Sequence, residues 1–106
     1  DRLKEIIITG GFNVAPTEVE DVLTSHPDIE SAAVVALPKS SGGEDVAAAI
    51  VVRDGVDISS EAVRDYCKTR LAAYKVPRRI VVVDDLPRSL IGKVLRREVR
   101  ERLMSS

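Results

Sequence analysis

Lys93 has the most unusual position of any charged residue in the sequence. It follows Gly92 directly and stands where the last predicted helix begins, although the positive end of a helix dipole disfavours a cation. Leu95 opens the buried stripe of that helix, and a residue two positions earlier lies about 200° around the axis. We therefore expect Lys93 to be exposed on a glycine-hinged loop, where a mobile ammonium group could meet an anionic ligand. The alternative is an ordinary lysine of a basic, solvated helix.

Two further groups of residues could bind a ligand. Gly10 and Gly11 follow a short β-branched run, and paired glycines allow positive φ and the close approach of a ligand to the backbone. Tyr74, Lys75 and Arg78 form a basic loop that would suit a phosphate-bearing ligand, with cations for the phosphates and one aromatic ring for a base. Each group also has a simpler interpretation, as a turn and as a solvated loop.

Several kinds of site are excluded by composition. Cys67 is the only cysteine and His26 the only histidine, so the sequence has no internal disulfide and we expect no metal site. Aromatic residues are 3% of the chain, too few for the stacking platforms that bind single-stranded nucleic acid, and we expect no nucleic-acid partner. Glu18 and Glu20 lie on different faces of their predicted helix, so they are expected to favour its N-terminus and not to form an acid–base pair.

The 106 residues are enough for one domain with one core. A net charge of −1 hides an asymmetry: residues 1–63 carry 4 basic and 12 acidic side chains, and residues 64–106 carry 12 basic and 5 acidic ones. The basic half is expected either to meet an anionic ligand or to attract the acidic half within the fold. No apolar run reaches the ~18–20 residues of a membrane span and no signal peptide is visible, so we expect a cytoplasmic protein with no transmembrane segment.

The elements predicted from periodicity and chain breakers run in the order βαββαβα. Residues 4–9 are expected to form a strand or a hairpin arm. Further strands are expected at residues 31–37, 46–52 and 80–83, and helices at 16–26, 60–71 and from about 93 onward. Pro16 suits a first helical position and Ser59 an N-cap, while residues 12–15 are predicted as a tight connection. The expected fold class is α+β, a small mixed β-sheet flanked by helices. Its first six elements also match a ferredoxin-like order.

Three stretches carry the motifs of one known family. They are residues 1–20 (DRLKEIIITGGFNVAPTEVE), 74–78 (YKVPR) and 86–98 (LPRSLIGKVLRRE). Together they resemble the C-terminal domain of the acyl-adenylate-forming enzymes, a superfamily that includes acyl-CoA synthetases, nonribosomal peptide adenylation domains and firefly luciferase. The motifs occur in the family's order and cover essentially the whole chain.

The resemblance implies a reaction with two steps. A carboxylic acid attacks ATP to give an acyl-adenylate and pyrophosphate, and a thiol, usually that of coenzyme A, then displaces AMP. ATP, Mg²⁺ and the acid would be bound mainly by a large N-terminal domain, the partner of this one, and residues 1–106 contain no phosphate-binding loop or Walker motif. Residues 1–106 are thus expected to be a single mobile C-terminal domain, inactive alone, that takes one pose for each step.

The resemblance also assigns roles to single residues. Lys93 matches the catalytic lysine that reaches the substrate carboxylate and the α-phosphate, a contact whose loss typically costs on the order of 3–4 kcal/mol. Lys4 matches the hinge residue, and Arg2 matches the arginine that contacts the ribose region of the adenylate. Gly10 and Gly11 match the loop that lines the pantetheine tunnel, where a side chain could block the path of the thiol.

Other positions narrow the comparison. Tyr74 and Arg78 match positions that contact the coenzyme A nucleotide in some family members. Gly42 stands where many coenzyme A ligases of the family carry an aromatic residue, and Ile91 replaces a frequent Thr or Ser. With the SLIGKVLRR run, these features look most like bacterial long-chain fatty acid–CoA ligases.

Two other functions are open at this point. The chain could be part of an adenylation domain that serves a carrier protein, or it could be a non-catalytic ferredoxin-like binding module. In a binding module Lys93→Ala would change stability by no more than about 0.5 kcal/mol and would have no catalytic effect. The resemblance further implies a lysine acetyltransferase as a partner, because acetylation of Lys93 would remove the charge that the first step needs.

Overall fold

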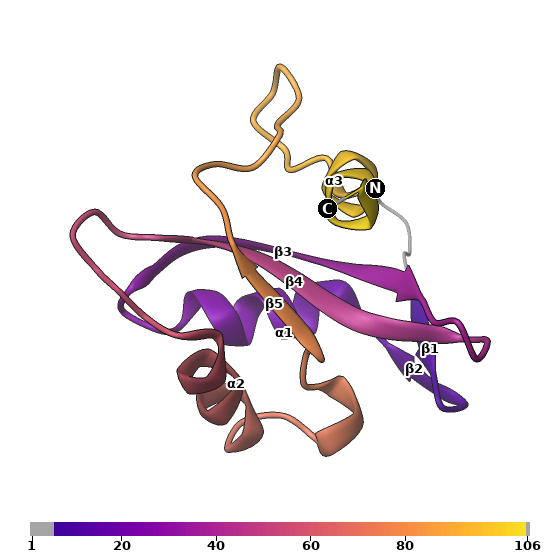
Figure 1. The fold of residues 1–106 in the computed structure, drawn as a ribbon. Helices are drawn as coiled ribbons and strands as arrows, with labels where there is room; N and C mark the ends of the chain where they lie inside the picture. The colour runs from indigo at the N-terminus through magenta and orange to yellow at the C-terminus, as the bar shows by residue number, and fades with distance from the viewer. Residues whose placement is uncertain (1–5, 106) are drawn as a thin grey trace.

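The computed structural model describes residues 6–105, which form two sheets and the helices around them (Figure 1). The strands are β1 (Ile7–Thr9), β2 (Phe12–Val14), β3 (Ile29–Pro38), β4 (Glu44–Val52) and β5 (Arg79–Val82). The helices are α1 (Pro16–Thr24), α2 (Ser60–Lys68), the 3₁₀ helix η1 (Ala73–Lys75) and α3 (Arg96–Ser105). The main sheet has the order β3–β4–β5, in which β3 and β4 are antiparallel and β4 and β5 are parallel. The strands β1 and β2 form a separate antiparallel hairpin.

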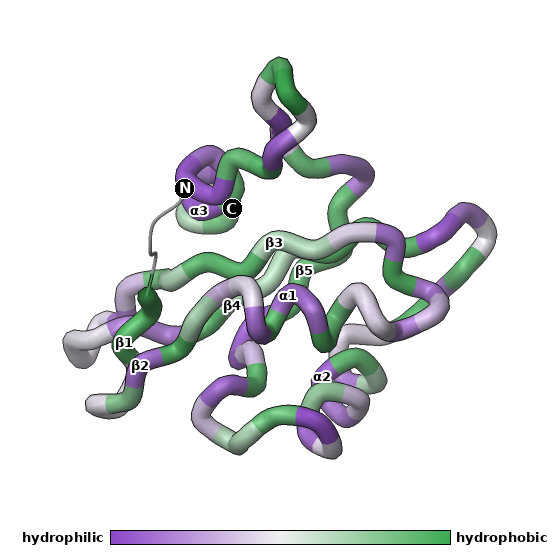
Figure 2. The backbone as a smooth tube through the Cα atoms, turned by 180° about the vertical axis from the view of Figure 1, so that it is seen from behind, coloured by the Kyte–Doolittle hydropathy of each residue, from purple (hydrophilic) through white to green (hydrophobic). Residues whose placement is uncertain are grey.

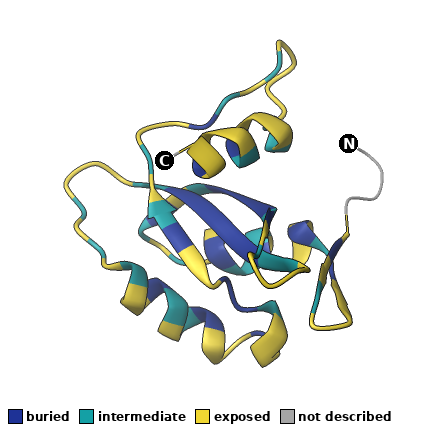
Figure 3. Cartoon of the chain, turned by 45° about the vertical axis from the view of Figure 1, so that its right-hand side comes forward, coloured by how far each residue is buried: buried dark blue, intermediate teal, exposed yellow. Residues whose placement is uncertain are grey.

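Helices cover both faces of the main sheet, so β4 is buried on both sides. α1 and α2 lie on one face and α3 lies on the other (Figures 1 and 3). Val46, Ala48 and Ile50 belong to the cluster under α1 and α2, whereas Ala47 and Ala49 belong to the cluster under α3. A strand with two buried faces needs no polar alternation, which explains why residues 46–52 are an unbroken apolar run.

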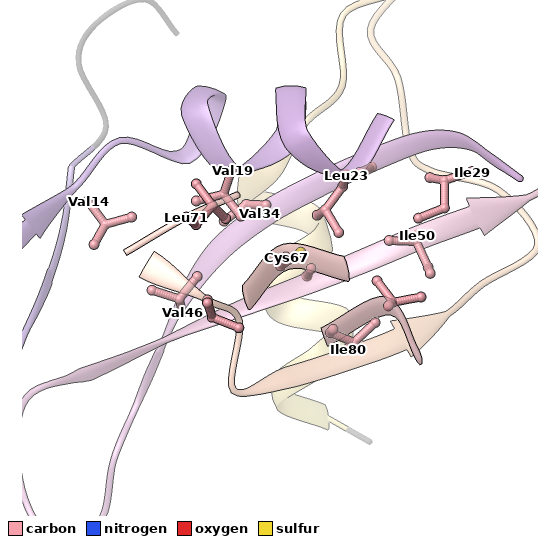
Figure 4. Packing of buried hydrophobic residues seen from close by; sticks show 14 of the residues in the cluster. Val14, Val19, Leu23, Ile29, Val34, Val46, Ile50, Cys67, Leu71 and Ile80 are labelled. Carbon is pink, nitrogen blue, oxygen red and sulfur yellow. The ribbon is translucent and has the colours of Figure 1, made fainter. Parts of the chain in front are cut away.

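Two apolar clusters hold the three layers together. The larger cluster lies between the sheet and the helices α1 and α2, and it extends to Val14 of the β1–β2 hairpin (Figure 4). Leu23 of α1 and Cys67 of α2 are fully buried in it. Val99 and Leu103 of α3 anchor the smaller cluster. Each α-helix therefore buries an apolar face against the main sheet.

The predicted fold class, α+β with a small mixed sheet flanked by helices, is confirmed. Pro16 opens α1, and Ser59 caps α2 by accepting the N–H of Ala62 at 3.0 Å. Residues 12–15, expected as a connection, instead supply β2, because a two-residue turn brings Phe12–Val14 back along β1. The hairpin stays outside the main sheet, so the described residues do not form the four-stranded sheet of a ferredoxin-like fold.

The α-helices of residues 6–105 have at most 10 residues each. None of them combines the length and the apolar character that crossing a bilayer would need. The described part of the chain has a radius of gyration of 13.0 Å, which is the size expected of about 100 residues packed as one unit.

Candidate functional site

Lys93 lies on a hairpin formed by residues 88–94, which protrudes above the main sheet (Figure 1). The N–H of Ser89 donates to the carbonyl of Lys93 at 2.8 Å, and the N–H of Gly92 donates to the carbonyl of Ser89 at 2.9 Å. Gly92 has a φ of +87°, the left-handed conformation that closes a three-residue hairpin loop. Lys93 is exposed, as predicted, and a hydrogen-bonded hairpin presents it.

The expectation that Lys93 opens the last helix is wrong. α3 begins at Arg96, three positions later. The N–H of Leu95 donates to the carbonyl of Pro87 at 2.9 Å, so the intervening residues extend the hairpin and do not start the helix. The position of Lys93 is therefore determined by the hairpin and has no relation to a helix dipole.

A carboxylate from α1 fixes the start of α3. Glu20 Oε1 lies 2.6 Å from Arg96 Nη2, and Glu20 Oε2 accepts from Arg96 Nε at 2.8 Å, a bidentate pair. Glu20 Oε2 also accepts the N–H of Val34 in β3 at 2.8 Å. Because α1 and α3 cover opposite faces of the sheet, Glu20 reaches across the edge strand to the base of the Lys93 hairpin. Sequence reasoning placed Glu20 only at a helix N-terminus, and the opposite charges of the two halves were the signal for this pair.

Gly10 and Gly11 form the turn between β1 and β2. Their φ values are +56° and +83°, and a two-residue hairpin turn with positive φ at both positions is the type that matches the twist of the strands. A Cβ at either glycine would meet no atom within 4 Å. Backbone conformation therefore favours glycine here, and crowding within the described residues does not. The turn is exposed and open to a ligand.

Aromatic rings border the Gly10–Gly11 turn. Phe12 of β2 stacks on Tyr74 of η1, with ring centroids 4.3 Å apart and planes inclined by 18°. Lys75 Nζ lies 2.9 Å from both carboxylate oxygens of Glu18, and this hydrogen bond raises the pKa of Lys75 above its ordinary value. The structure thus brings Tyr74 beside the glycine turn. Sequence reasoning misses Phe12 because residues 12–15 are predicted as a connection, although an aromatic residue directly after paired glycines is a signal.

Arg78 lies at the rim of a basic groove. Its N–H donates to the carbonyl of Val46 at 2.8 Å, and Arg64 Nη2 donates to its carbonyl at 3.2 Å, so the backbone is fixed while the side chain is exposed. The groove measures about 330 Å³ and is lined by Arg64, Lys68, Ala73, Val76, Pro77 and Arg78. Three of these side chains are cationic and none is acidic, so the groove could hold a phosphate group.

The candidate residues fall into two places. The hairpin of Lys93 stands on the α3 side of the sheet, whereas the Gly10–Gly11 turn with Tyr74 lies at another end of the domain (Figures 1 and 3). The structure therefore does not bring Lys93 together with the glycine turn. Arg2 and Lys4, predicted to contact the adenylate and to act as the hinge, lie outside the described residues.

Cys67 and His26 serve the packing of the domain. Burial raises the pKa of the Cys67 thiol above its ordinary value, and the positive charge of Arg70 lowers it to a smaller extent. The imidazole Nδ1 of His26 accepts the N–H of Asp28 at 3.0 Å, and its ring meets Tyr66 edge-on with centroids 4.7 Å apart. Within residues 6–105, no group of three His, Cys, Asp or Glu side chains could hold a metal ion.

Comparison with curated proteins finds CoA ligases. Long-chain-fatty-acid–CoA ligase FadD13 of Mycobacterium tuberculosis is 45% identical over 101 residues, which cover 95% of this chain and 20% of that protein. Long-chain-fatty-acid–CoA ligase of Escherichia coli is 42% identical over 101 residues, 95% of this chain and 18% of that protein. 2-Succinylbenzoate–CoA ligase of Geobacillus kaustophilus is 46% identical over 100 residues, 94% of this chain and 20% of that protein. The chain therefore spans about a fifth of the length of these relatives.

Solved structures and a family model agree with these relatives. A fatty acyl CoA synthetase of Mycobacterium tuberculosis has a TM-score of 0.90 at 39% identity, with 99% of this chain and 21% of that chain covered. The amide bond synthetase McbA of Marinactinospora thermotolerans has a TM-score of 0.89 at 43% identity, with coverages of 96% and 21%. The model of the AMP-binding enzyme C-terminal domain matches residues 18–93. The resemblance inferred from the motifs is confirmed, and this chain belongs to the AMP-binding enzyme C-terminal domain family.

Proposed function

We propose that this chain is the C-terminal domain of an ATP-dependent carboxylic acid–CoA ligase. The observation that carries the proposal is the separation of two candidate sites on one domain, the Lys93 hairpin and the Gly10–Gly11 turn. A domain of this size can present only one of these features to a single reaction centre at a time. Two successive steps, each with its own pose of the domain, account for both.

In the first step, Lys93 supplies a positive charge to the adenylation reaction. Its ammonium group contacts the substrate carboxylate and the α-phosphate, and offsets the negative charge that develops between them. A positioned donor of this kind typically contributes a factor of about 10²–10³ in rate. The exposed hairpin supports this role, because the lysine has to project out of its own domain to reach a reaction centre held by another. Because Lys93 is exposed, a lysine acetyltransferase could also reach it, and this enzyme stays a proposed partner.

In the second step, the Gly10–Gly11 turn lines the path of the pantetheine thiol. The absence of side chains on the turn keeps that path open, and the ring of Tyr74 stacked on Phe12 forms its border. Arg78, on the basic groove, is proposed to contact the phosphates of coenzyme A. The groove fits such a group, because cations line it and no carboxylate does.

ATP, Mg²⁺ and the acid are assigned mainly to a large N-terminal domain, in keeping with relatives about five times as long as this chain. Arg2 is proposed to contact the adenylate, and Lys4 to act as the hinge. A fatty acid is the first substrate to test, because FadD13 is a close relative, but 2-succinylbenzoate–CoA ligase is equally similar. The acid is therefore selected outside this domain. We place the reaction in the cytoplasm.

The experiment that tests the proposal is Lys93→Ala in the intact enzyme, with the two half-reactions measured separately. The rate of adenylation, measured as pyrophosphate release, should fall about 10²–10³-fold. The rate at which preformed acyl-adenylate is converted to acyl-CoA should change little. Arg102→Ala removes an exposed cation on α3, away from the Lys93 hairpin, and should leave both steps unchanged. Equal loss in both steps would contradict the role of Lys93. Transfer to a pantetheine-bearing carrier protein in preference to free coenzyme A would favour the carrier-dependent alternative.

A further inference from the structure

The tip of the Lys93 hairpin is apolar and entirely exposed. Leu90 and Ile91 are 107% and 86% exposed, and Figure 2 shows the hydrophobic tip flanked by hydrophilic chain. Turn tips are usually built from Gly, Pro, Asn, Asp and Ser. Single exposed apolar residues are common on proteins, but two adjacent aliphatic side chains on a protruding turn are not explained by the fold that carries them.

The hairpin holds this tip in a fixed conformation. Leu90 and Ile91 occupy the two central positions of a turn closed by the hydrogen bond from the N–H of Gly92 to the carbonyl of Ser89. The Ser89 hydroxyl also accepts the N–H of Lys93 at 3.3 Å. Only Gly92 separates Ile91 from Lys93, so any surface that receives the tip also receives the lysine.

The base of the hairpin is held as firmly as its tip. Arg88 bridges to Val94 across the hairpin, and the guanidinium of Arg88 donates to the carbonyl of Gly92 at 3.1 Å. Below it, Arg96 is paired with Glu20. The hairpin therefore moves with the whole domain, and a force that binds its tip acts on the orientation of the domain.

We propose that Leu90 and Ile91 form an apolar anchor that is buried in the large N-terminal domain when Lys93 enters the adenylation site. The inference rests on the proposed function. The occupant is the large domain and not a lipid bilayer, because burial of the tip must leave Lys93 beside the anionic reactants. The anchor favours the adenylating pose alone, because the thioester-forming pose turns a different end of the domain, the Gly10–Gly11 turn, toward the reaction centre. A contact made in one of two states shifts the equilibrium toward that state.

The test is the double variant Leu90→Asn with Ile91→Asn in the intact enzyme. Asparagine suits turns, so the hairpin is retained while its apolar surface is lost. Adenylation should slow about tenfold or more, the size expected when two aliphatic side chains lose their burial, and acyl-CoA formation from preformed adenylate should change less than twofold. The apolar double variant Leu90→Met with Ile91→Leu should retain adenylation. Met104→Gln, which alters another exposed apolar residue, is the matched control.

The outcomes separate this inference from the function on which it rests. If Lys93→Ala abolishes adenylation while the asparagine variant has no effect, the anchor is wrong and the proposed function stands. If Lys93→Ala leaves adenylation intact, the proposed function itself fails. If the asparagine variant adenylates normally but sediments less with vesicles of phosphatidylglycerol and phosphatidylcholine, the tip binds lipid and the anchor is overturned. Equal slowing of both half-reactions also overturns it.

Discussion

Glycine residues decide where the two hairpins can turn. Gly10, Gly11 and Gly92 have φ values of +56°, +83° and +87°, a region that costs other L-residues roughly 1–2 kcal/mol. No atom lies within 4 Å of a Cβ built at any of the three. Substitutions at these positions therefore act through backbone strain within this domain. Any steric effect on activity has to come from what the hairpin approaches in the intact enzyme.

Gly10→Asn separates the effect of backbone strain from the effect of a side chain that blocks the thiol path. Asn tolerates left-handed φ, and Asn-Gly is a preferred pair for this turn, so the free energy of unfolding should change by less than about 1 kcal/mol. If the turn lines the thiol path, acyl-CoA formation from preformed adenylate should fall more than about tenfold, with adenylation unchanged. Gly55→Asn is the matched control, because Gly55 has a φ of +80° in another open turn. Normal thioester formation by the Gly10 variant would remove the turn from the path.

Among the helices and strands, the sequence predicts correctly the features that depend on residues close together in the chain. The N-cap Ser59 and the strand expected at residues 46–52 depend on neighbours along the chain, and both predictions are confirmed. β2 was missed because three residues are too few to show a period, and its pairing is completed by the turn. The start of α3 was misplaced because the bond between Leu95 and Pro87, which holds the preceding residues in the hairpin, is not visible in helical spacing.

In the candidate site, too, the sequence predicts features that depend on neighbouring residues and misses those that depend on distant partners. Lys93 and the glycine pair are predicted as candidate site residues because their neighbours in the sequence are distinctive. Lys93 is exposed, as predicted, and the glycine turn is exposed too, while the roles of both stay predictions. Phe12 and Glu20 were not found, since each acts through a partner more than sixty positions away, Tyr74 in one case and Arg96 in the other. The path of the chain through the fold determines which distant residues meet. The charge or the aromatic ring of a residue does not show which of many possible partners it contacts.

The pair of Glu20 and Arg96 is expected to stabilise the domain measurably. Their side chains are only 15% and 21% exposed, so removing one partner leaves a partly buried charge uncompensated. Glu20→Gln and Arg96→Gln should each lower the free energy of unfolding by roughly 1–3 kcal/mol. The loss should be larger for Glu20→Gln, because Glu20 also accepts the N–H of Val34.

Urea denaturation of the single and double variants measures this coupling. The double variant should lose less stability than the two single losses added together, because both remove the same interaction. Lys68→Gln is the control, since its pair with Asp65 is 61% and 67% exposed and should contribute less than about 1 kcal/mol. Strictly additive losses would show that Glu20 and Arg96 act independently.

For the whole molecule, the opposite charges of the two halves are partly used within the fold. Glu18 pairs with Lys75, and Glu20 pairs with Arg96, so part of the asymmetry joins the acidic half to the basic half within the fold. Lys93 and Arg78 are exposed, and we assign them to anionic ligands. The attraction between the two halves is therefore present in the fold, and contact with an anionic ligand stays a prediction for Lys93 and Arg78.

The isolated chain of 106 residues should fold and yet be inactive. Ala33 and Val34 are adjacent in β3 but lie in different apolar clusters. Because the two clusters share the strands of the main sheet, unfolding of one cluster would expose the other to water. We expect one cooperative urea transition, coincident by far-UV circular dichroism and by tyrosine fluorescence. Mass spectrometry should detect no acyl-CoA from a fatty acid, ATP, Mg²⁺ and coenzyme A beyond a control without protein, because the proposed reaction centre belongs to the larger domain. Sustained acyl-CoA formation by these residues alone would refute that assignment, whereas two separate transitions would show that the layers fold independently.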